Sequence, residues 1–288
     1  MMNLMYSIVG FSFLLLSCGV QRFELPSELK EISGIEQISG DLFVSINDSG
    51  DEPYLYFLNS KGVIKHKMYV AGAKNIDWED ITYDGKHLYV GDFGNNLNNR
   101  RDLALYKIDI DTTIKTAYEG MDYGERLRDT ARAIRYNYKY PDQENYPPLK
   151  NQMNFDSEAL TYARGSILIL TKSRTKPFKP ISKIYNCNFK EDQLELTLPV
   201  EIEIKGNSWI GGSVTGCDFK EDKLYVLTYR HIYIFRWSDF KFNLEQKMRI
   251  GRLQQWEAIC VGEDNQIYIA SEKSQLGKQK LQIIKKSD

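Results

Sequence analysis

The fold is decided by the stretch Asn75-Ile76-Asp77-Trp78-Glu79-Asp80-Ile81-Thr82-Tyr83 and by the run that follows it at residues 86–96. The stretch begins with acidic residues, continues as a short apolar segment and reaches a turn at Asp84-Gly85. Alternating apolar and polar residues are typical of half-buried strands, and Asp-Gly is typical of a hairpin turn. The stretch therefore predicts two antiparallel strands that begin and end in polar groups.

The same pattern recurs along the chain. Residues 155–162 are followed by 166–172, and residues 255–261 by 266–273, each with Glu near the start of the first segment. Two weaker copies, residues 32–48 and 214–230, have Gly where we align this Glu. The aligned anchor positions of the five copies are Gly34, Glu79, Glu158, Gly216 and Glu257.

These repeats predict an all-β fold, a single β-propeller of four-stranded antiparallel blades. Spacings of roughly 40 to 50 residues with several short strands each are typical of propeller arrays. We expect five blades, near residues 32–70, 77–140, 155–204, 214–250 and 255–288, with six as the alternative because the gap from Glu79 to Glu158 is long. The last blade lacks a fourth strand, so we expect residues 21–25 to supply it and close the ring, which removes exposed sheet edges. One propeller domain over residues 18–288 is the predicted organisation.

Composition excludes some classes of partner. The chain has 38 basic and 39 acidic residues, a net charge of -1, so we expect no nucleic-acid partner. Aromatic residues make up 12% of the chain and suit pleated strands. Trp78, Trp209 and Trp256 are expected in the core between blades.

The first residues resemble the signal peptide of bacterial lipoproteins. An apolar run at residues 6–16 is too short to cross a bilayer alone and ends in Leu15-Leu16-Ser17-Cys18-Gly19, which resembles a lipobox. The resemblance implies a signal peptide at residues 1–17, acylation of Cys18 and membrane anchoring in the bacterial cell envelope, outside the cytoplasm. Residues 1–5 contain no Lys or Arg, and an ordinary secretory signal is the alternative. Of the remaining cysteines, Cys217 and Cys260 fall in predicted inner strands as buried thiols, and we expect no essential disulfide.

The order of motifs also resembles a known group. It runs from Asn47-Asp48-Ser49-Gly50-Asp51 through Asp77-Trp78-Glu79 and Gly91-Asp92-Phe93-Gly94-Asn95 to Asp156-Ser157-Glu158-Ala159-Leu160. It resembles secreted bacterial propeller proteins of unassigned function and, more distantly, the esterase-like phytase and SdiA-regulated propeller families. The resemblance implies a β-propeller and a bound calcium ion. It does not imply phytase activity, because no Lys, Arg and His cluster here matches a phosphate site.

Polar residues are predicted to gather at one mouth of the central channel. The first strand of a blade lines the channel and pairs antiparallel with the second, so its start lies beside the end of the second strand. Carboxylates at these places suit Ca²⁺, which takes several oxygen ligands, and the absence of His argues against zinc or copper. The predicted metal ligands are Asp48, Glu79, Asp92, Glu158 and Glu257.

The predicted ligand-binding residues at the same mouth are Asn47, Asn95, Lys172, Arg230 and Glu272. An alternative interpretation is that the acidic residues only join the blades, by accepting strand amides or pairing with Lys172, Arg230 or Lys273. Buried carboxylates need such partners in any case. The sequence alone favours this second interpretation.

Two functional hypotheses follow. The first is a lipid-anchored propeller that binds a protein or a small-molecule ligand at the channel mouth, with calcium as a possible cofactor. The second is a calcium-dependent hydrolase of phosphoesters, lactones or glycosides that uses the acidic ring. No catalytic residue is assigned, because no nucleophile elbow or other catalytic motif is present.

Overall fold

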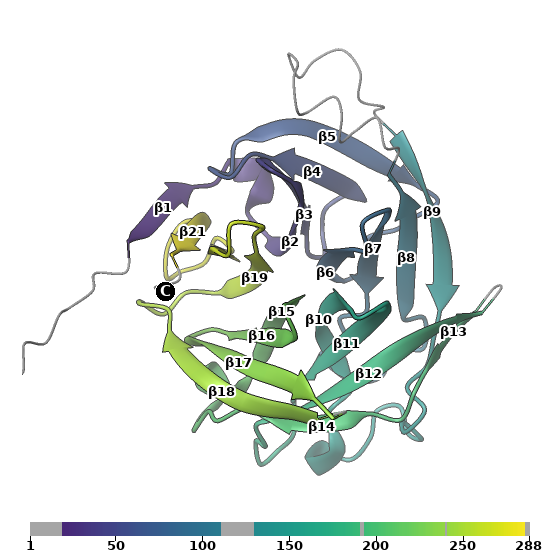
Figure 1. Ribbon diagram of the computed structural model, residues 1–288. Helices are drawn as coiled ribbons and strands as arrows, with labels where there is room; N and C mark the ends of the chain where they lie inside the picture. Colours follow the sequence, from purple (N-terminus) through teal and green to yellow (C-terminus); the bar gives the residue numbers. More distant parts are fainter. Residues whose placement is uncertain (1–18, 111–129, 191–192, 240, 286–288) are drawn as a thin grey trace, which may run out of the picture.

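A computed structural model describes residues 19–110, 130–190, 193–239 and 241–285. Its strands form a ring of antiparallel sheets around a central channel, which confirms the predicted propeller fold (Figure 1). The predicted signal peptide, with Cys18, and most of the long insertion after Asp109 lie outside the described residues.

Antiparallel pairing divides the described strands into five units. The first unit comprises β2 (Ile32–Ser39), β3 (Leu42–Asn47), β4 (Tyr54–Leu58) and β5 (Ile64–Ala71). The second comprises β6 (Trp78–Tyr83), β7 (His87–Asp92), β8 (Ala104–Asp109) and β9 (Thr130–Asn137). The third comprises β10 (Asp156–Ala163), β11 (Ser166–Lys172), β12 (Ile181–Lys190), β13 (Gln193–Leu196) and β14 (Val200–Glu203). The fourth comprises β15 (Val214–Lys220), β16 (Lys223–Thr228), β17 (His231–Ser238) and β18 (Lys241–Arg249). The fifth comprises β19 (Trp256–Val261), β20 (Ile267–Ser271), β21 (Lys280–Ile284) and β1 (Val20–Glu24). In the described part of the chain, three short helices lie in the connections: η1 (Ser27–Leu29), η2 (Lys150–Gln152) and α2 (Trp209–Gly212).

The ring is closed by the N-terminal strand, as predicted. β1 pairs antiparallel with β21 along its whole length, from Val20 opposite Ile284 to Glu24 opposite Lys280. The innermost strands β2, β6, β10, β15 and β19 contact one another in a closed cycle around the channel (Figure 1). A short parallel pairing of β5 with β9 also joins the rims of the first two units.

The third unit differs from the predicted four-stranded blade, because its outer strand is not continuous. This strand is divided into β13 and β14, which pair with opposite halves of β12. Pro199 lies between them and has no N–H to donate to β12, so the ladder is interrupted there.

Each inner strand carries a β-bulge near its start. The extra residues at these bulges are Ser33, Glu79, Glu158, Thr215 and Glu257. The sequence alignment on Gly34 and Gly216 was therefore wrong by one position, because these glycines follow the bulged residue. Both glycines allow adjacent inner strands to approach closely. A Cβ on Gly34 would lie 2.8 Å from the backbone N of Ile81, and one on Gly216 would lie 2.9 Å from the carbonyl of Glu257.

The core fills the space between neighbouring units. Trp78 and Trp256 are fully buried in two of its clusters, as expected. Cys187, Cys217 and Cys260 are buried and free, which confirms the expected burial of Cys217 and Cys260. The expectation for Trp209 is wrong, since this side chain on α2 is 43% exposed.

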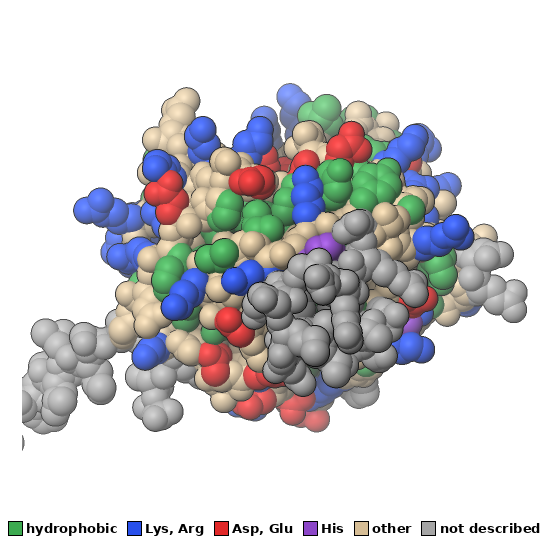
Figure 2. All heavy atoms as spheres, turned by 90° about the horizontal axis from the view of Figure 1, so that it is seen from above, with side chains coloured by type: hydrophobic (Ala, Val, Ile, Leu, Met, Phe, Trp, Pro, Cys, Tyr) green, Lys and Arg blue, Asp and Glu red, His purple; other side chains and the backbone are tan. Residues whose placement is uncertain are grey.

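One outer face of the molecule carries acidic and basic side chains interspersed with apolar ones (Figure 2). Among the described residues, no helix has the length and apolar character needed to cross a bilayer.

Candidate functional site

The site lies at the channel mouth where inner strands begin and second strands end. Three of the five bulged residues are Glu79, Glu158 and Glu257. The other two are hydroxyl residues that join neighbouring units. Ser33 donates a hydrogen bond of 3.0 Å to the carbonyl of Trp78, and Thr215 one of 2.6 Å to the carbonyl of Trp256. The bulges thus place three carboxylates and two hydroxyls around one ring.

Three carboxylates form a compact group, here called the acidic triad: Asp48, Asp77 and Glu79. One carboxylate oxygen from each lies within 4.8 Å of those of the other two. Asp48 follows β3, whereas Asp77 precedes β6 and Glu79 is the bulged residue of β6. None of the three forms a salt bridge with a basic side chain of the described residues.

Loop hydrogen bonds hold the acidic triad in place. Asn75 donates from Nδ2 to the carbonyl of Asp48 at 2.8 Å and accepts at Oδ1 from the N–H of Trp78 at 3.1 Å. The N–H of Asp77 donates to Oδ1 of Asp92 at 3.1 Å, and its carbonyl accepts the N–H of Gly94 at 3.2 Å. These contacts fix the acidic triad between the first and second units.

Repulsion within the acidic triad is relieved when the triad binds protons or a cation. Burial, and then the neighbouring Asp48 carboxylate, raise the pKa of Asp77 to about 7. Burial, followed by the charge of Glu158, raises the pKa of Glu79 well above its ordinary value. Burial also raises the pKa of Asp48. Three carboxylates this close do not all ionise unless a positive charge lies between them.

A second group around the mouth is paired. Glu158 accepts from Lys172 and from Arg174, each at 2.9 Å, and Arg174 also binds Asp156. Although burial opposes it, the Glu158 carboxylate holds the pKa of Lys172 well above its ordinary range. Burial, and then Glu158, raise the pKa of Asp156 to about 7 although Arg174 opposes the change.

Tyr229 connects this paired group to the fifth unit. Lys172 Nζ donates to the Tyr229 hydroxyl at 2.9 Å, and Tyr229 in turn is hydrogen-bonded to Glu257. Burial raises the pKa of Glu257 to about 8, against the opposing charge of Lys172. Glu272 accepts from Gln255 at 3.0 Å, and burial followed by the charge of Glu257 raises its pKa to about 9.

The remaining residues predicted at the channel mouth belong to neither the acidic triad nor the paired group. Asp92 is fully buried and pairs with Arg100 at 2.9 Å, while its Oδ2 has no hydrogen-bond partner among the described residues. Asn95 donates its N–H to Asp156 at 2.6 Å and its Nδ2 to the carbonyl of Phe155 at 2.9 Å, so it joins the second and third units. Asn47 donates to Asp51 at 2.7 Å. Arg230 is exposed, and its side chain makes no ion pair with the carboxylates described above.

Four residues that line the mouth are not among the predicted metal or ligand-binding residues: Asp77, Asp156, Arg174 and Tyr229. The sequence does contain a signal for Asp77 and Asp156, since each stands two positions before a bulged Glu in an Asp-x-Glu pattern. Arg174 and Tyr229 follow the second strands of their units within two residues. They belong to loops, whose path the strand pattern does not define.

Deeper in the channel, a second ring lies three residues after each bulge: Glu36, Thr82, Thr161, Asp218 and Cys260. Oxygen and sulfur atoms of Glu36, Asp218 and Cys260 lie within 4.8 Å of one another. The carboxylates here accept hydrogen bonds: Glu36 from Thr82 at 3.0 Å, and Asp218 from the N–H groups of Phe219 and Val261.

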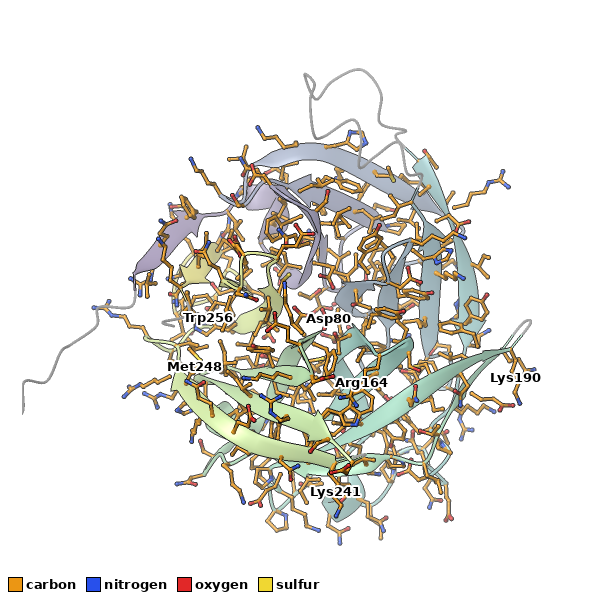
Figure 3. All side chains as sticks on the ribbon, viewed as in Figure 1. Asp80, Arg164, Lys190, Lys241, Met248 and Trp256 are labelled. Atoms are coloured by element: carbon orange, nitrogen blue, oxygen red, sulfur yellow. The ribbon has the colours of Figure 1, made fainter. Side chains whose placement is uncertain are left out.

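Asp80, near the middle of the ring in Figure 3, accepts the N–H of Leu160 at 2.8 Å. This carboxylate, like Asp218, therefore joins one inner strand to the next. The alternative interpretation, in which acidic residues join the blades by accepting strand amides, therefore describes Asp80 and Asp218.

Comparison with known proteins supports the fold. No family model and no curated protein matches the sequence. Among solved structures, glutaminyl cyclase from Myxococcus xanthus superposes with a TM-score of 0.52 at 11% identity, over 91% of this chain and 93% of that chain. The aldose sugar dehydrogenase from Escherichia coli in its apo-form gives 0.50 at 10% identity, over 93% of this chain and 99% of that chain. At these identities the likeness shows a propeller fold alone.

Proposed function

We propose that this protein is a ligand-binding propeller that holds a divalent cation, with calcium preferred, at the mouth of its channel. The observation that carries the proposal is the acidic triad. Three carboxylate oxygens converge within 4.8 Å with no basic partner among the described residues. A bound cation would remove the repulsion that otherwise favours protonation of these groups.

The chemistry of the donors supports calcium. Carboxylate oxygens are hard ligands, and Ca²⁺ accepts six to eight of them with flexible geometry, so water or ligand oxygens would complete the shell. Gly94 supplies a second observation. A Cβ at this position would lie 2.2 Å from Oε1 of Glu79 and 2.3 Å from Oδ2 of Asp77. Only glycine therefore leaves the two carboxylates room to converge.

Thermal unfolding in EDTA and in added Ca²⁺, with metal analysis of the purified protein, tests this proposal. A cation that binds only the folded state stabilises it by roughly 2.7 kcal/mol at a hundredfold excess over Kd. We expect a calcium-dependent rise in Tm that is lost in Glu79→Gln and in Gly94→Ala, but kept in the exposed control Glu195→Gln. No rise and no bound metal in the wild-type protein would refute the cation site.

A calcium-dependent hydrolase is the second candidate. The observation in its favour is that Asp156, at the mouth but outside the acidic triad, has a pKa raised to about 7, which suits proton transfer near neutral pH. Assays with chromogenic phosphoesters, lactones and glycosides test it. Calcium-dependent turnover that Glu158→Gln abolishes would support an enzyme. Calcium binding without turnover of these substrates would leave the binding function.

We also propose that the protein is anchored to a membrane of the cell envelope through acylated Cys18. The support is the lipobox-like sequence at residues 15–19. Mass spectrometry of the N-terminal peptide tests the modification, and Cys18→Ser is expected to release the protein from the membrane fraction. An unmodified Cys18 in membrane-isolated protein would refute the anchor.

A further inference from the structure

A groove lies beside the channel mouth, above the third unit. It has a volume of about 590 Å³, within the range of small-molecule sites. Its walls come from the loop after β7, from η2 and the residue after it, from the loop after β11, and from α2. The groove is therefore formed by loops of the second and third units and by the connections on either side of the third unit.

One wall of the groove is apolar and open to solvent. Trp209 is 43% exposed and Leu97 is 66% exposed, and Met153, Pro177 and Phe178 line the same space. An exposed indole beside other apolar groups is unusual on a monomer surface and is typical of a contact site. This wall suits a flat aromatic or an acyl group.

Among the described residues, the charged groups of the groove are all basic. Lys150, Arg174 and Lys176 line it, and no Asp or Glu of the described part of the chain does. Arg174 is paired with Asp156 and Glu158, whereas Lys150 and Lys176 are exposed and form no ion pair within the described residues. Two ammonium groups beside an apolar wall are thus free to bind an anion.

The groove is continuous with the channel mouth. Trp209 packs on Tyr229 with ring centroids 5.1 Å apart, and Lys172 Nζ lies 5.8 Å from the centroid of the Trp209 ring. Arg174 belongs to both places, since it lines the groove and binds Glu158. A ligand seated on Trp209 would therefore adjoin the carboxylates of the mouth.

We propose that this groove binds a small organic anion with an aromatic or acyl body, whose apolar part packs on Trp209 and whose charged group is neutralised by Lys150 and Lys176. The inference rests on the proposed function because it names the class of ligand that the channel mouth receives. The anionic group would be a carboxylate, sulfonate or phosphate, since lysine ammonium groups act as point charges without the bidentate geometry of Arg.

A matched pair of fluorescent probes tests the inference: 8-anilinonaphthalene-1-sulfonate and N-phenyl-1-naphthylamine, which differ by the sulfonate. Titrations of the wild-type chain in EDTA are expected to show at least tenfold tighter binding of the sulfonate. Lys150→Glu/Lys176→Glu is expected to abolish this preference while leaving the affinity for the neutral probe within about twofold. Trp209→Ala is expected to weaken binding of both probes.

The control variant is Lys61→Glu/Lys86→Glu, which makes the same change in net charge at exposed positions of the first and second units. Equal affinity of the wild-type protein for the two probes would overturn the inference. An equal loss of sulfonate binding in the control variant would also overturn it, because bulk charge would then explain the effect.

The same titrations on Glu79→Gln separate this inference from the cation site. Sulfonate binding that persists in EDTA and in Glu79→Gln supports the groove even if calcium binding fails. Calcium binding without a preference for the sulfonate refutes the groove alone. Loss of both refutes both proposals.

Discussion

At the scale of single residues, Lys172 is a more deeply buried cation of the channel mouth than Arg174. Its side chain is 4% exposed and contacts both Glu158 and Tyr229. Removal of one partner from a buried ion pair leaves the other charge uncompensated and typically costs about 3–5 kcal/mol. Because Glu158 keeps Arg174 as a second basic partner, we expect Lys172→Met to lower the free energy of unfolding by less than this, about 1–3 kcal/mol, in urea denaturation.

The control for this prediction is Lys190→Met. Lys190 pairs with Glu195 at 2.6 Å, but both side chains are largely exposed, 62% and 51%. Such pairs are worth less than about 1 kcal/mol. Similar losses in the two variants would contradict the buried role of Lys172.

Glu36, in the second ring of the channel, is expected to make the free energy of unfolding depend on pH. Burial, and then the charge of Asp218, raise its pKa from 4.5 to about 8. The folded state therefore binds this proton more tightly than the unfolded state. The stability from this group is fully present below pH 4.5 and is lost as the pH rises to about 8.

We expect Glu36→Gln to reduce the fall in unfolding free energy between pH 5 and 8, since the amide remains neutral throughout. Denaturation at several pH values measures it, with the exposed Glu195→Gln as control. Identical pH profiles of Glu36→Gln and the wild-type protein would exclude titration of Glu36 in this range.

At the scale of elements, the close approach of inner strands depends on Gly34. Its missing Cβ would stand 2.8 Å from the backbone N of Ile81, and a backbone atom cannot move aside as a flexible side chain can. Overpacking of this kind costs about 1–3 kcal/mol. Gly34→Ala is expected to lower the Tm, whereas Gly211→Ala, whose Cβ would have 3.8 Å of clearance, is expected to leave it nearly unchanged. Equal Tm values for both variants would contradict the strand-contact explanation.

Strand positions were largely predictable because alternation and turn residues are local signals. The hairpin of β6 and β7 follows directly from residues 78–92. The bulges were not predictable, since a single extra residue leaves the alternation nearly unchanged on either side. The alignment therefore placed Gly34 where Ser33 belongs.

The candidate site was predictable only in part, because strand ends have local signals in the sequence whereas contacts between loops do not. Asp48 and Glu79 lie at strand ends, where antiparallel pairing brings them to one mouth. Trp209 lies in the connection between the third and fourth units and Arg174 in a loop within the third unit, and the neighbours of both are set by tertiary packing. An apolar residue such as Trp209 also carries no sign, within the sequence, that it remains exposed.

At the scale of the whole molecule, closure depends on β1. Phe23 of this strand packs against the core cluster that contains Leu281 and Ile283. Removal of residues 20–24 would expose the edge of β21, and exposed edges invite association between chains. We expect the truncated protein to have a lower Tm and to form oligomers in size-exclusion chromatography, compared with a chain beginning at Gly19. A monomeric truncated protein with unchanged Tm would contradict this role.

The pairing of β1 with β21 also imposes an order on synthesis of the chain. The first strand leaves the ribosome long before its partner exists, and at 5–20 residues per second the delay is roughly 10 to 50 s. During this interval Phe23 of β1 and Leu25 directly after it have no core cluster to join. We therefore expect the newly made chain to remain prone to association with other chains until its last strand has emerged and the ring has closed.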